Sequence, residues 1–330
     1  MNASETADYA ILGEPDQALV RALRRDARAP WSQLAAVLGT SEQTVARRYR
    51  RLHSAGLLRV VGVPIGRRLG YSEWLFRIQC TPNTGPAVAL ALAGRPDILW
   101  IDLLAGGTEI ICFPHARSVR QRDDLLLDKL PRTGRVVSVS AQSVLRHFMR
   151  REIPKGLPRP RLDRDDELLL RELARDGRAG YAELAVAIGR SETTVKRRIE
   201  QLTNAGALAF APEIDPALLG LETEAVLWLS VAPARLEQVG QTMSQHPEVA
   251  YVAATTGPTN LVAFLTCRDA DAFYAYLTTT LGTMPDVHTV ETSPLIRNVK
   301  RSGFVKDGVR LLDPPDGQVS RRKVPGSSRG

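Results

Sequence analysis

The first sixty residues place their apolar side chains at helical intervals. Three short amphipathic helices are predicted from these apolar positions: Leu19 and Leu23; Leu34, Ala35 and Leu38; Val45, Tyr49 and Leu52. Gly39 can end the second helix in a left-handed conformation, and Ser41 can accept hydrogen bonds from the free amides of the third. This order of helix, cap and basic helix predicts a helix-turn-helix unit.

The same pattern returns 150 residues further along the chain (166 − 16 = 150). Asp166 matches Asp16, and Ser191 matches Ser41, without a gap between them. About half of the positions from 16 to 58 are identical to their partners, which is far above chance. The chain therefore contains a tandem duplication.

Each helix-turn-helix unit is followed by alternating strand and helix patterns. In the first copy the predicted segments are 74–80, 86–93, 98–104, 110–113, 117–130 and 136–140. In the second copy they are 224–231, 236–243, 250–255, 261–266, 272–281 and 287–290. Both series run strand, helix, strand, strand, helix, strand, which is the order of the ferredoxin-like split motif.

These elements predict an α+β fold, a tandem repeat of a winged helix-turn-helix unit and a ferredoxin-like βαββαβ domain. The stretch 57–63 is interpreted as a strand that forms a wing or a tether. The predicted boundaries are 15–63 and 164–213 for the helix-turn-helix domains, 70–148 and 221–301 for the ferredoxin-like domains, 149–163 for a Pro-rich linker and 313–330 for a disordered tail.

A net charge of +8 favours an anionic partner, either nucleic acid or an acidic membrane surface. The sequence contains no apolar run of the length that spans a membrane, and its start lacks the features of a secretory signal. We therefore expect a soluble cytoplasmic protein. Cys80, Cys112 and Cys267 lie far apart in apolar runs, so we expect three buried, reduced thiols.

The charge is concentrated on the third helix of the first copy. Its outward face is rich in arginine, which suits the major groove and the phosphates of double-stranded DNA. The predicted DNA-binding residues are Ser41, Gln43, Thr44, Arg47, Arg48, Arg50, Arg51, Ser191, Thr193, Thr194, Lys196, Arg197 and Arg198. Glu200 and Gln201 replace Arg50 and Arg51 in the second copy. The alternative is a solvated helical bundle that contacts other proteins.

Two turns are candidates for a small-molecule site. The predicted effector-binding residues are Gly106, Gly107, Thr108 and Glu109 in the first copy and Gly257, Pro258, Thr259 and Asn260 in the second. An ordinary β-turn is the alternative interpretation of both. The five histidines show no metal-ligand spacing, and the sequence has no Gly-rich phosphate loop or nucleophile elbow. We therefore expect no catalytic residues, metal site or cofactor.

With these residues in view, the chain resembles the Lrp/AsnC family of feast-or-famine transcription regulators, with two units fused in tandem. The resemblance rests on Leu34-Ala35, Gly39, Ser41, Thr44-Val45, Arg48, Leu52 and Gly56, and on the same pattern from Leu184 to Gly206. It implies a DNA-binding regulator whose ferredoxin-like domains pair through their sheets and bind an effector, such as an amino acid, in clefts between them. The family usually carries Asp where Glu109 and Asn260 stand.

The resemblance also implies a form of assembly and leaves two alternatives. Members of the family often build larger rings, so we expect a homo-oligomer built from intrachain pseudo-dimers. Sirohaem decarboxylases are similar to this family and use His and Arg side chains around a tetrapyrrole. In those enzymes the Asn-Leu pair of the turn is flanked by His and an aromatic residue, whereas here Thr259 and Val262 flank Asn260-Leu261. The other alternative is an architectural chromosome-coating protein.

Overall fold

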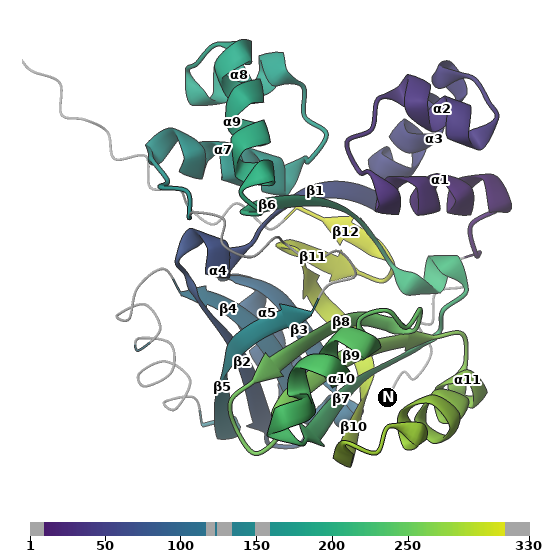
Figure 1. Cartoon of the computed structure of the whole chain (residues 1–330), viewed down its shortest axis with the longest axis vertical. Helices are drawn as coiled ribbons and strands as arrows, with labels where there is room; N and C mark the ends of the chain where they lie inside the picture. The colour runs from purple at the N-terminus through teal and green to yellow at the C-terminus, as the bar shows by residue number, and fades with distance from the viewer. Residues whose placement is uncertain (1–9, 117–122, 124–133, 149–158, 314–330) are drawn as a thin grey trace, which may run out of the picture.

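The computed structural model describes residues 10–116, 123, 134–148 and 159–313. Two helical heads lie side by side above a two-stranded ribbon, and a larger barrel of strands lies below it (Figure 1). The expected α+β fold with a tandem order of elements is confirmed. Most of the predicted helix at 117–130, most of the linker at 149–163, residues 1–9 and the tail beyond residue 313 lie outside the described residues.

Head one consists of three helices: α1 (Glu14–Arg25), α2 (Trp31–Leu38) and α3 (Glu42–Ser54). Leu19, Leu23 and Val45 are fully buried between these helices, as their spacing predicts. Gly39 ends α2 with a φ of 61°, a left-handed conformation that glycine adopts without strain. The sharp corner between α2 and α3 follows from this residue.

Head two repeats this arrangement with α7 (Arg164–Arg175), α8 (Tyr181–Ile188) and α9 (Glu192–Asn204). A capping box begins α7, because the Asp163 side chain accepts from the Asp166 amide and the Asp166 side chain accepts from the Asp163 amide. Leu169, Leu173 and Val195 form its core. Each head therefore has a separate hydrophobic core of its own.

The two heads are joined by an antiparallel ribbon of β1 (Leu58–Pro64) and β6 (Leu208–Ile214). The strand predicted at 57–63 is therefore a tether, and its partner is the matching strand of the other copy. Arg28 of head one donates to the carbonyl of Gly177 at 2.7 Å, and Arg178 of head two donates to the carbonyl of Ala27 at 2.7 Å. These two arginines are equivalents in the repeat, so the contact between the heads is reciprocal.

Barrel half one contains β2 (Ser72–Cys80), α5 (Gly85–Ala93), β3 (Ile98–Leu104), β4 (Glu109–Ala116) and β5 (Val136–Phe148). A short helix, α4 (Gly66–Leu69), precedes it, and a 3-10 turn, η1 (Ala105–Gly107), joins β3 to β4. Apolar side chains of the sheet, including Phe76 and Ile78, pack with Val88 and Ala89 of α5. The helix covers the outer face of the sheet.

Barrel half two contains β7 (Thr223–Val231), α10 (Leu236–Met243), β8 (Val249–Thr255), β9 (Leu261–Cys267), α11 (Ala270–Ala275) and β10 (Val287–Arg301). Short helical turns flank them: η3 (Pro216–Leu219), η4 (Pro233–Arg235), η5 (Tyr276–Thr280) and η6 (Leu281–Thr283). Met243 and Tyr276 of the helical layer pack with Leu227 and Leu229 of β7.

Two long strands close the halves into one barrel. β5 pairs with β2 over residues 136–143 and then with β8 of the other half over residues 144–148. β10 pairs with β7 over residues 287–294 and then with β3 over residues 295–300. The predicted strands 136–140 and 287–290 were too short, because the second part of each strand pairs with the opposite half of the chain.

The interior of the barrel, between the sheet of half one and the sheet of half two, is filled by side chains of both halves. Leu75 and Leu104 of half one pack with Val226, Trp228 and Val262 of half two, and all five are fully buried. The interior of the barrel is therefore a hydrophobic core that neither half could build alone.

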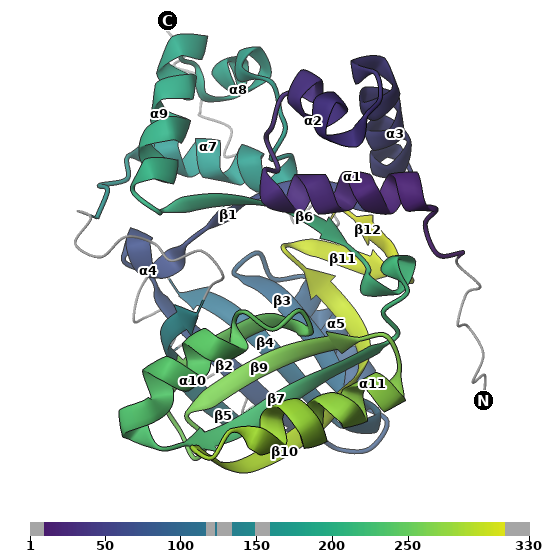
Figure 2. The ribbon, with the colours of Figure 1, turned by 45° about the vertical axis from the view of Figure 1, so that its right-hand side comes forward.

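Beyond β10 the chain forms a hairpin of β11 (Phe304–Asp307) and β12 (Arg310–Leu312), which the sequence pattern did not predict. The hairpin lies between the barrel and the β1–β6 ribbon (Figure 2). Phe304 and Leu311 are buried against Val61 of β1. Val309, at the turn of the hairpin, belongs to the core of head one.

Candidate DNA-binding and effector sites

Each basic helix begins with a serine cap. The Ser41 hydroxyl accepts a hydrogen bond from the Thr44 amide at 3.2 Å, and the Ser191 hydroxyl accepts one from the Thr194 amide at 3.3 Å. The cap satisfies an amide of the first turn that has no partner within the helix. α3 and α9 thus begin at equivalent residues of the two heads.

One face of each basic helix is buried in its head, and the other faces solvent. Val45, Tyr49 and Leu52 of α3 are buried, as are Val195, Ile199 and Leu202 of α9. The exposed predicted residues are Ser41, Gln43, Arg47, Arg50 and Arg51 on α3 and Ser191, Thr193, Lys196 and Arg197 on α9, while Thr44 and Thr194 are half-buried. The amphipathic interpretation of both helices therefore holds.

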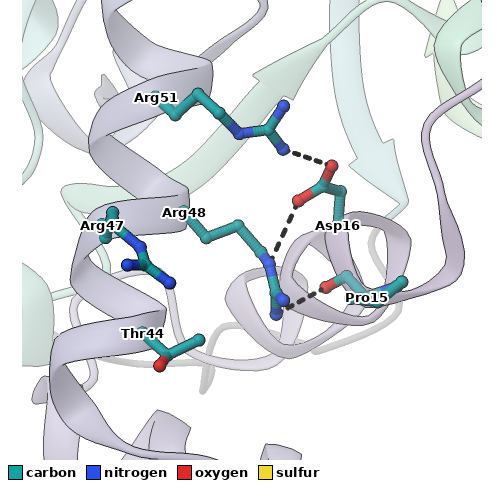
Figure 3. A pocket seen from close by; sticks show the side chains of 6 residues that line it. All are labelled: Pro15, Asp16, Thr44, Arg47, Arg48 and Arg51. Atoms are coloured by element: carbon teal, nitrogen blue, oxygen red, sulfur yellow. Dashed lines mark hydrogen bonds and ion pairs between the residues drawn. The ribbon is translucent and has the colours of Figure 1, made fainter.

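Two arginines of α3 converge on one acidic residue of α1 (Figure 3). Arg48 forms an ion pair with Asp16, with its Nε 3.2 Å from Oδ1, and also donates to the Pro15 carbonyl at 3.3 Å. Arg51 forms an ion pair with the other oxygen of Asp16. With Thr44 and Arg47, these residues line a pocket between α1 and α3. Asp16 therefore fixes the guanidinium groups of Arg48 and Arg51 at the rim of this pocket.

Arg198 of head two is the repeat equivalent of Arg48, and its partner Asp166 is the equivalent of Asp16. Arg198 is half-buried, forms an ion pair with Asp166 and donates to the Arg161 carbonyl at 2.9 Å. The hydrogen bonds that Arg198 donates to the Asp166 carboxylate raise the pKa of Arg198. Arg48 and Arg198 thus attach α3 and α9 to the first helix of each head, and a DNA contact by either one stays a prediction.

Four cations of the basic helices have no acidic partner among the described residues: Arg47, Arg50, Lys196 and Arg197. All four are exposed. Arg50 donates from Nε to the Ala46 carbonyl of its own helix at 3.3 Å, which leaves its charge uncompensated. The helices that carry them, α3 and α9, belong to the two heads, which lie on the opposite side of the β1–β6 ribbon from the barrel (Figures 1 and 2).

The first candidate effector turn lies beside a partly buried charge network. Glu109 is 3% exposed and accepts from Arg77 at 2.9 Å and from Gln79 at 2.7 Å. Arg77 also forms an ion pair with Glu291 of β10, and this bond raises the pKa of Arg77. The carboxylate predicted to bind an effector is therefore already paired with side chains of the protein, whereas Gly106, Gly107 and Thr108 are more exposed.

The second candidate turn uses its amide side chain for the fold. Asn260 accepts from the Val231 amide at 2.9 Å and donates to the Val231 carbonyl at 2.8 Å. Gly257 has a φ of 114°, a conformation that side-chain-bearing residues rarely adopt. The adjacent Thr256 amide donates to Ser143 of β5 at 3.0 Å. Pro258 is exposed and Thr259 is half-buried.

Both turns contact the terminal strand of the opposite half. Turn one contacts β10, where the Ser293 hydroxyl donates to Glu109 at 3.4 Å, and turn two contacts β5. Each turn therefore lies at a seam between the two halves. The seam positions agree with the expected location between paired domains, and the effector roles of the eight predicted residues stay predictions.

The roles of three residues in these sites were not predicted from the sequence. Asp16 and Asp166 are repeat equivalents at the start of a helix, and that matched position was the available signal. Arg77 lies in a strand pattern that gave no reason to expect a buried guanidinium. No group of His, Cys, Asp and Glu among the described residues could hold a metal ion. Within the same residues, no helix combines the length and apolar character needed to cross a membrane.

Comparison with known families agrees with this geometry. The model of the AsnC-type helix-turn-helix domain matches residues 14–53 and 162–203, and that of the Lrp/AsnC ligand binding domain matches residues 224–304. The chain belongs to the Lrp/AsnC family.

Relatives and solved structures extend this result. An HTH-type transcriptional regulator of Pyrococcus abyssi is 30% identical over 146 residues, which cover 44% of this chain and 92% of the relative. The regulator Ptr1 of Methanocaldococcus jannaschii is 28% identical over 42% of this chain and 95% of its own. The crystal structure of the siroheme decarboxylase NirDL has a TM-score of 0.64 with 14% identity, over 91% of this chain and 95% of that one. This last likeness shows a shared fold.

Proposed function

We propose that the protein is a sequence-specific transcriptional regulator that binds double-stranded DNA through α3 and α9. The observation that carries the proposal is the set of exposed cations, Arg47, Arg50, Lys196 and Arg197, which have no acidic partner among the described residues. Cations on a capped, exposed helix can neutralise DNA phosphates and reach base edges in the major groove. The related HTH-type regulators support this function.

The test is a fluorescence-anisotropy titration of the full chain on the DNA upstream of its own gene, at several salt concentrations. Replacing Arg47 and Arg197 together by alanine should weaken binding about ten-fold or more and reduce the salt slope by about two. The matched control replaces Arg235 and Arg268, which are exposed on barrel half two. Equal affinity of the wild type and the Arg47/Arg197 variant would contradict the proposal.

We further propose that a small molecule, such as an amino acid, binds at the two turns between the barrel halves. The match to the Lrp/AsnC ligand binding domain and the position of both turns at a seam support this site. A thermal-shift screen of amino acids should identify a ligand that raises the melting temperature. Thr108→Glu with Thr259→Glu should abolish that shift, whereas Thr279→Glu, on the outer helical layer, should retain it.

We propose that the chain acts by binding rather than by catalysis. The fold shared with a siroheme decarboxylase makes the enzyme the second candidate. The residues of turn two do not fit that chemistry, because Thr259 stands where a histidine is expected and Val262 is fully buried between the sheets. An absorption titration with sirohaem tests this directly. A stoichiometric spectral change would favour the enzyme.

A further inference from the structure

The two basic helices present different charges at equivalent positions. On α3 the exposed residues Arg50 and Arg51 add positive charge, whereas α9 carries the exposed residues Glu200 and Gln201 at the same places. A carboxylate that faces a phosphate repels it, and a glutamine releases no counterion. If both helices approach DNA in the same way, α3 will neutralise more phosphates than α9.

Two positions in the N-terminal part of each helix also differ. Gln43 and Ala46 of α3 correspond to Thr193 and Lys196 of α9. A glutamine can make two hydrogen bonds to adenine, whereas a lysine favours the acceptors of guanine. Because these positions are exposed or half-buried in both heads, the two helices should prefer different bases.

Head one is also attached to the barrel by the C-terminal hairpin. The Leu311 amide donates to the Gly56 carbonyl, just after α3, at 2.8 Å. Val309 belongs to the same hydrophobic core as Leu52 and Leu58 of head one. Arg59 lies 5.1 Å from the Phe304 ring and 3.5 Å from Asp313. The hairpin therefore packs against the C-terminal end of α3 on the side that faces the barrel.

The base of the hairpin is fixed to the barrel and to β6. Lys300 donates to the carbonyls of Ala93 and Arg95 at 2.9 and 2.6 Å, and Arg301 lies 3.1 Å from Glu213. Lys306 forms an ion pair with Asp215, which precedes η3. α3 is thus preorganised by a continuous set of buried contacts, and preorganisation lowers the entropic cost of binding.

Head two meets the barrel differently. Among the described residues, the end of α9 is contacted by the segment around α4, where Arg68 donates to the Ala205 carbonyl at 3.0 Å. The Ile65 amide donates to Ala207 at 2.9 Å. These bonds come from a helix of four residues that precedes the barrel and from the residue just before that helix, whereas head one is contacted by a hairpin that continues from a barrel strand.

We propose that the DNA partner of this chain is an operator with two unlike half-sites, in which head one makes the dominant contacts and head two reads a different, weaker half. The inference rests on the proposed function and names the partner more closely. The hairpin residues Val309 and Leu311 act as positioning residues for α3. Arg50, Arg51 and Glu200 set the difference in affinity between the halves.

The experiment begins with selection of binding sites from a random duplex library by the full chain. The selected site should be asymmetric. We call the half that head one contacts the left half, and the half that head two contacts the right half. Synthetic duplexes with left–right, left–left and right–right halves are then compared by anisotropy. We expect the left–right duplex to bind at least ten-fold more tightly than the right–right duplex. A palindromic selected site, or equal affinity for all three duplexes, overturns the inference.

Paired substitutions assign the halves to the heads. Arg50→Ala with Arg51→Ala should weaken left–right binding at least ten-fold and reduce the salt slope by about one to two, because Arg51 is also paired with Asp16. Glu200→Ala with Gln201→Ala should leave the affinity unchanged or raise it up to about three-fold, because a repulsive charge is removed. Equal losses from the two pairs refute the proposal. If the wild type binds no DNA site specifically, the proposed function fails as well. Failure of the unlike-half-site proposal alone is therefore distinguishable from failure of the proposed function.

The hairpin is tested with Val309→Ala and Leu311→Ala together. Hydroxyl-radical footprinting should show weaker protection of the left half and unchanged protection of the right half. A separate variant with the conservative changes Val309→Ile and Leu311→Ile should protect the left half as the wild type does. If the alanine pair fails to fold, Arg59→Gln can replace it, because this change removes only the side-chain contacts of Arg59 with the hairpin. Arg59→Gln should weaken the protection of the left half alone, by a smaller amount. Equal weakening of both halves contradicts a head-specific role.

Discussion

Arg77 and Trp228 show how single residues distinguish the two halves. Each is the sixth residue of its strand, β2 or β7, yet one is a cation and the other an aromatic residue. The Arg77 guanidinium lies 4.6 Å from the Trp228 ring and reaches Glu291 of β10. Two copies of half one would place two arginines at this position, so the charge pattern favours pairing with half two.

Glu224 is a half-buried carboxylate that should make stability depend on pH. Burial raises its pKa from 4.5 to about 7, and Arg301 opposes the rise only in part, with its Nη1 4.0 Å away. Between pH 4.5 and 7 the folded state retains a proton that the unfolded chain has released. The stability contribution is therefore complete below pH 4.5 and is lost as pH rises through 7.

Glu224→Gln should reduce this pH dependence. In the wild type the free energy of unfolding should fall between pH 5 and 7, and the variant should remove about 1–3 kcal/mol of that fall. Urea unfolding across this range measures the change. Burial also raises the pKa of Asp102, to about 6, so some dependence should remain in the variant. The exposed Glu222 gives a matched control as Glu222→Gln, and a variant profile parallel to that of the wild type would contradict the prediction.

At the scale of elements, the short, locally determined helices were predicted well. The helix expected at 236–243 is observed as Leu236–Met243, and Ser41 caps α3 as its position in the sequence suggested. Caps and apolar spacing act within one or two turns, so local sequence is sufficient for them. The role of the repeat-matched Arg28 and Arg178 was not predicted, because their carbonyl acceptors come from the other copy.

The reciprocal arginine contact should hold the heads together. Arg178 lies 3.7 Å from the Trp31 ring and donates to Ala27 and Ala29, while Arg28 donates to Gly177. Replacing both arginines by alanine should destabilise the heads by about 2–4 kcal/mol, since buried carbonyls lose charged donors.

Hydrogen exchange measures this effect separately in each part of the molecule. Amides of α1–α3 and α7–α9 should lose protection in the double variant, while amides of β2 and β7 should retain it. Arg25→Ala with Arg175→Ala removes two exposed arginines at the ends of α1 and α7 and is the matched control. Unchanged protection of the heads in the Arg28/Arg178 variant would rule out a role in holding them together.

At the scale of the whole molecule, the barrel should unfold as one unit. Its inter-sheet core contains side chains of both halves, and β5 and β10 each pair with strands of both. Neither half can lose its sheet without exposing apolar surface of the other. Cooperative unfolding of the two halves follows from this shared core.

Leu75→Ala tests this cooperativity. Leu75 belongs to half one and is fully buried in the inter-sheet core, so its truncation should destabilise the protein by about 2–5 kcal/mol. Protection of β9 amides in half two should fall with that of β4 amides in half one, as hydrogen exchange can measure. Leu90→Ala, at an exposed position on α5, is the control. Loss of protection confined to half one would show that the halves unfold independently.

The sequence by itself determined the duplicated order of elements, the helix caps and the exposed basic faces of α3 and α9. These features follow from the spacing of apolar residues and from hydrogen bonds between near neighbours, which a linear pattern records. The closed barrel, the hairpin beneath α3 and the partners of Arg48, Arg77 and Glu109 were decided only by the tertiary structure. The side-chain partners among them join residues from 30 to more than 200 positions apart, and such contacts depend on how the chain packs in three dimensions.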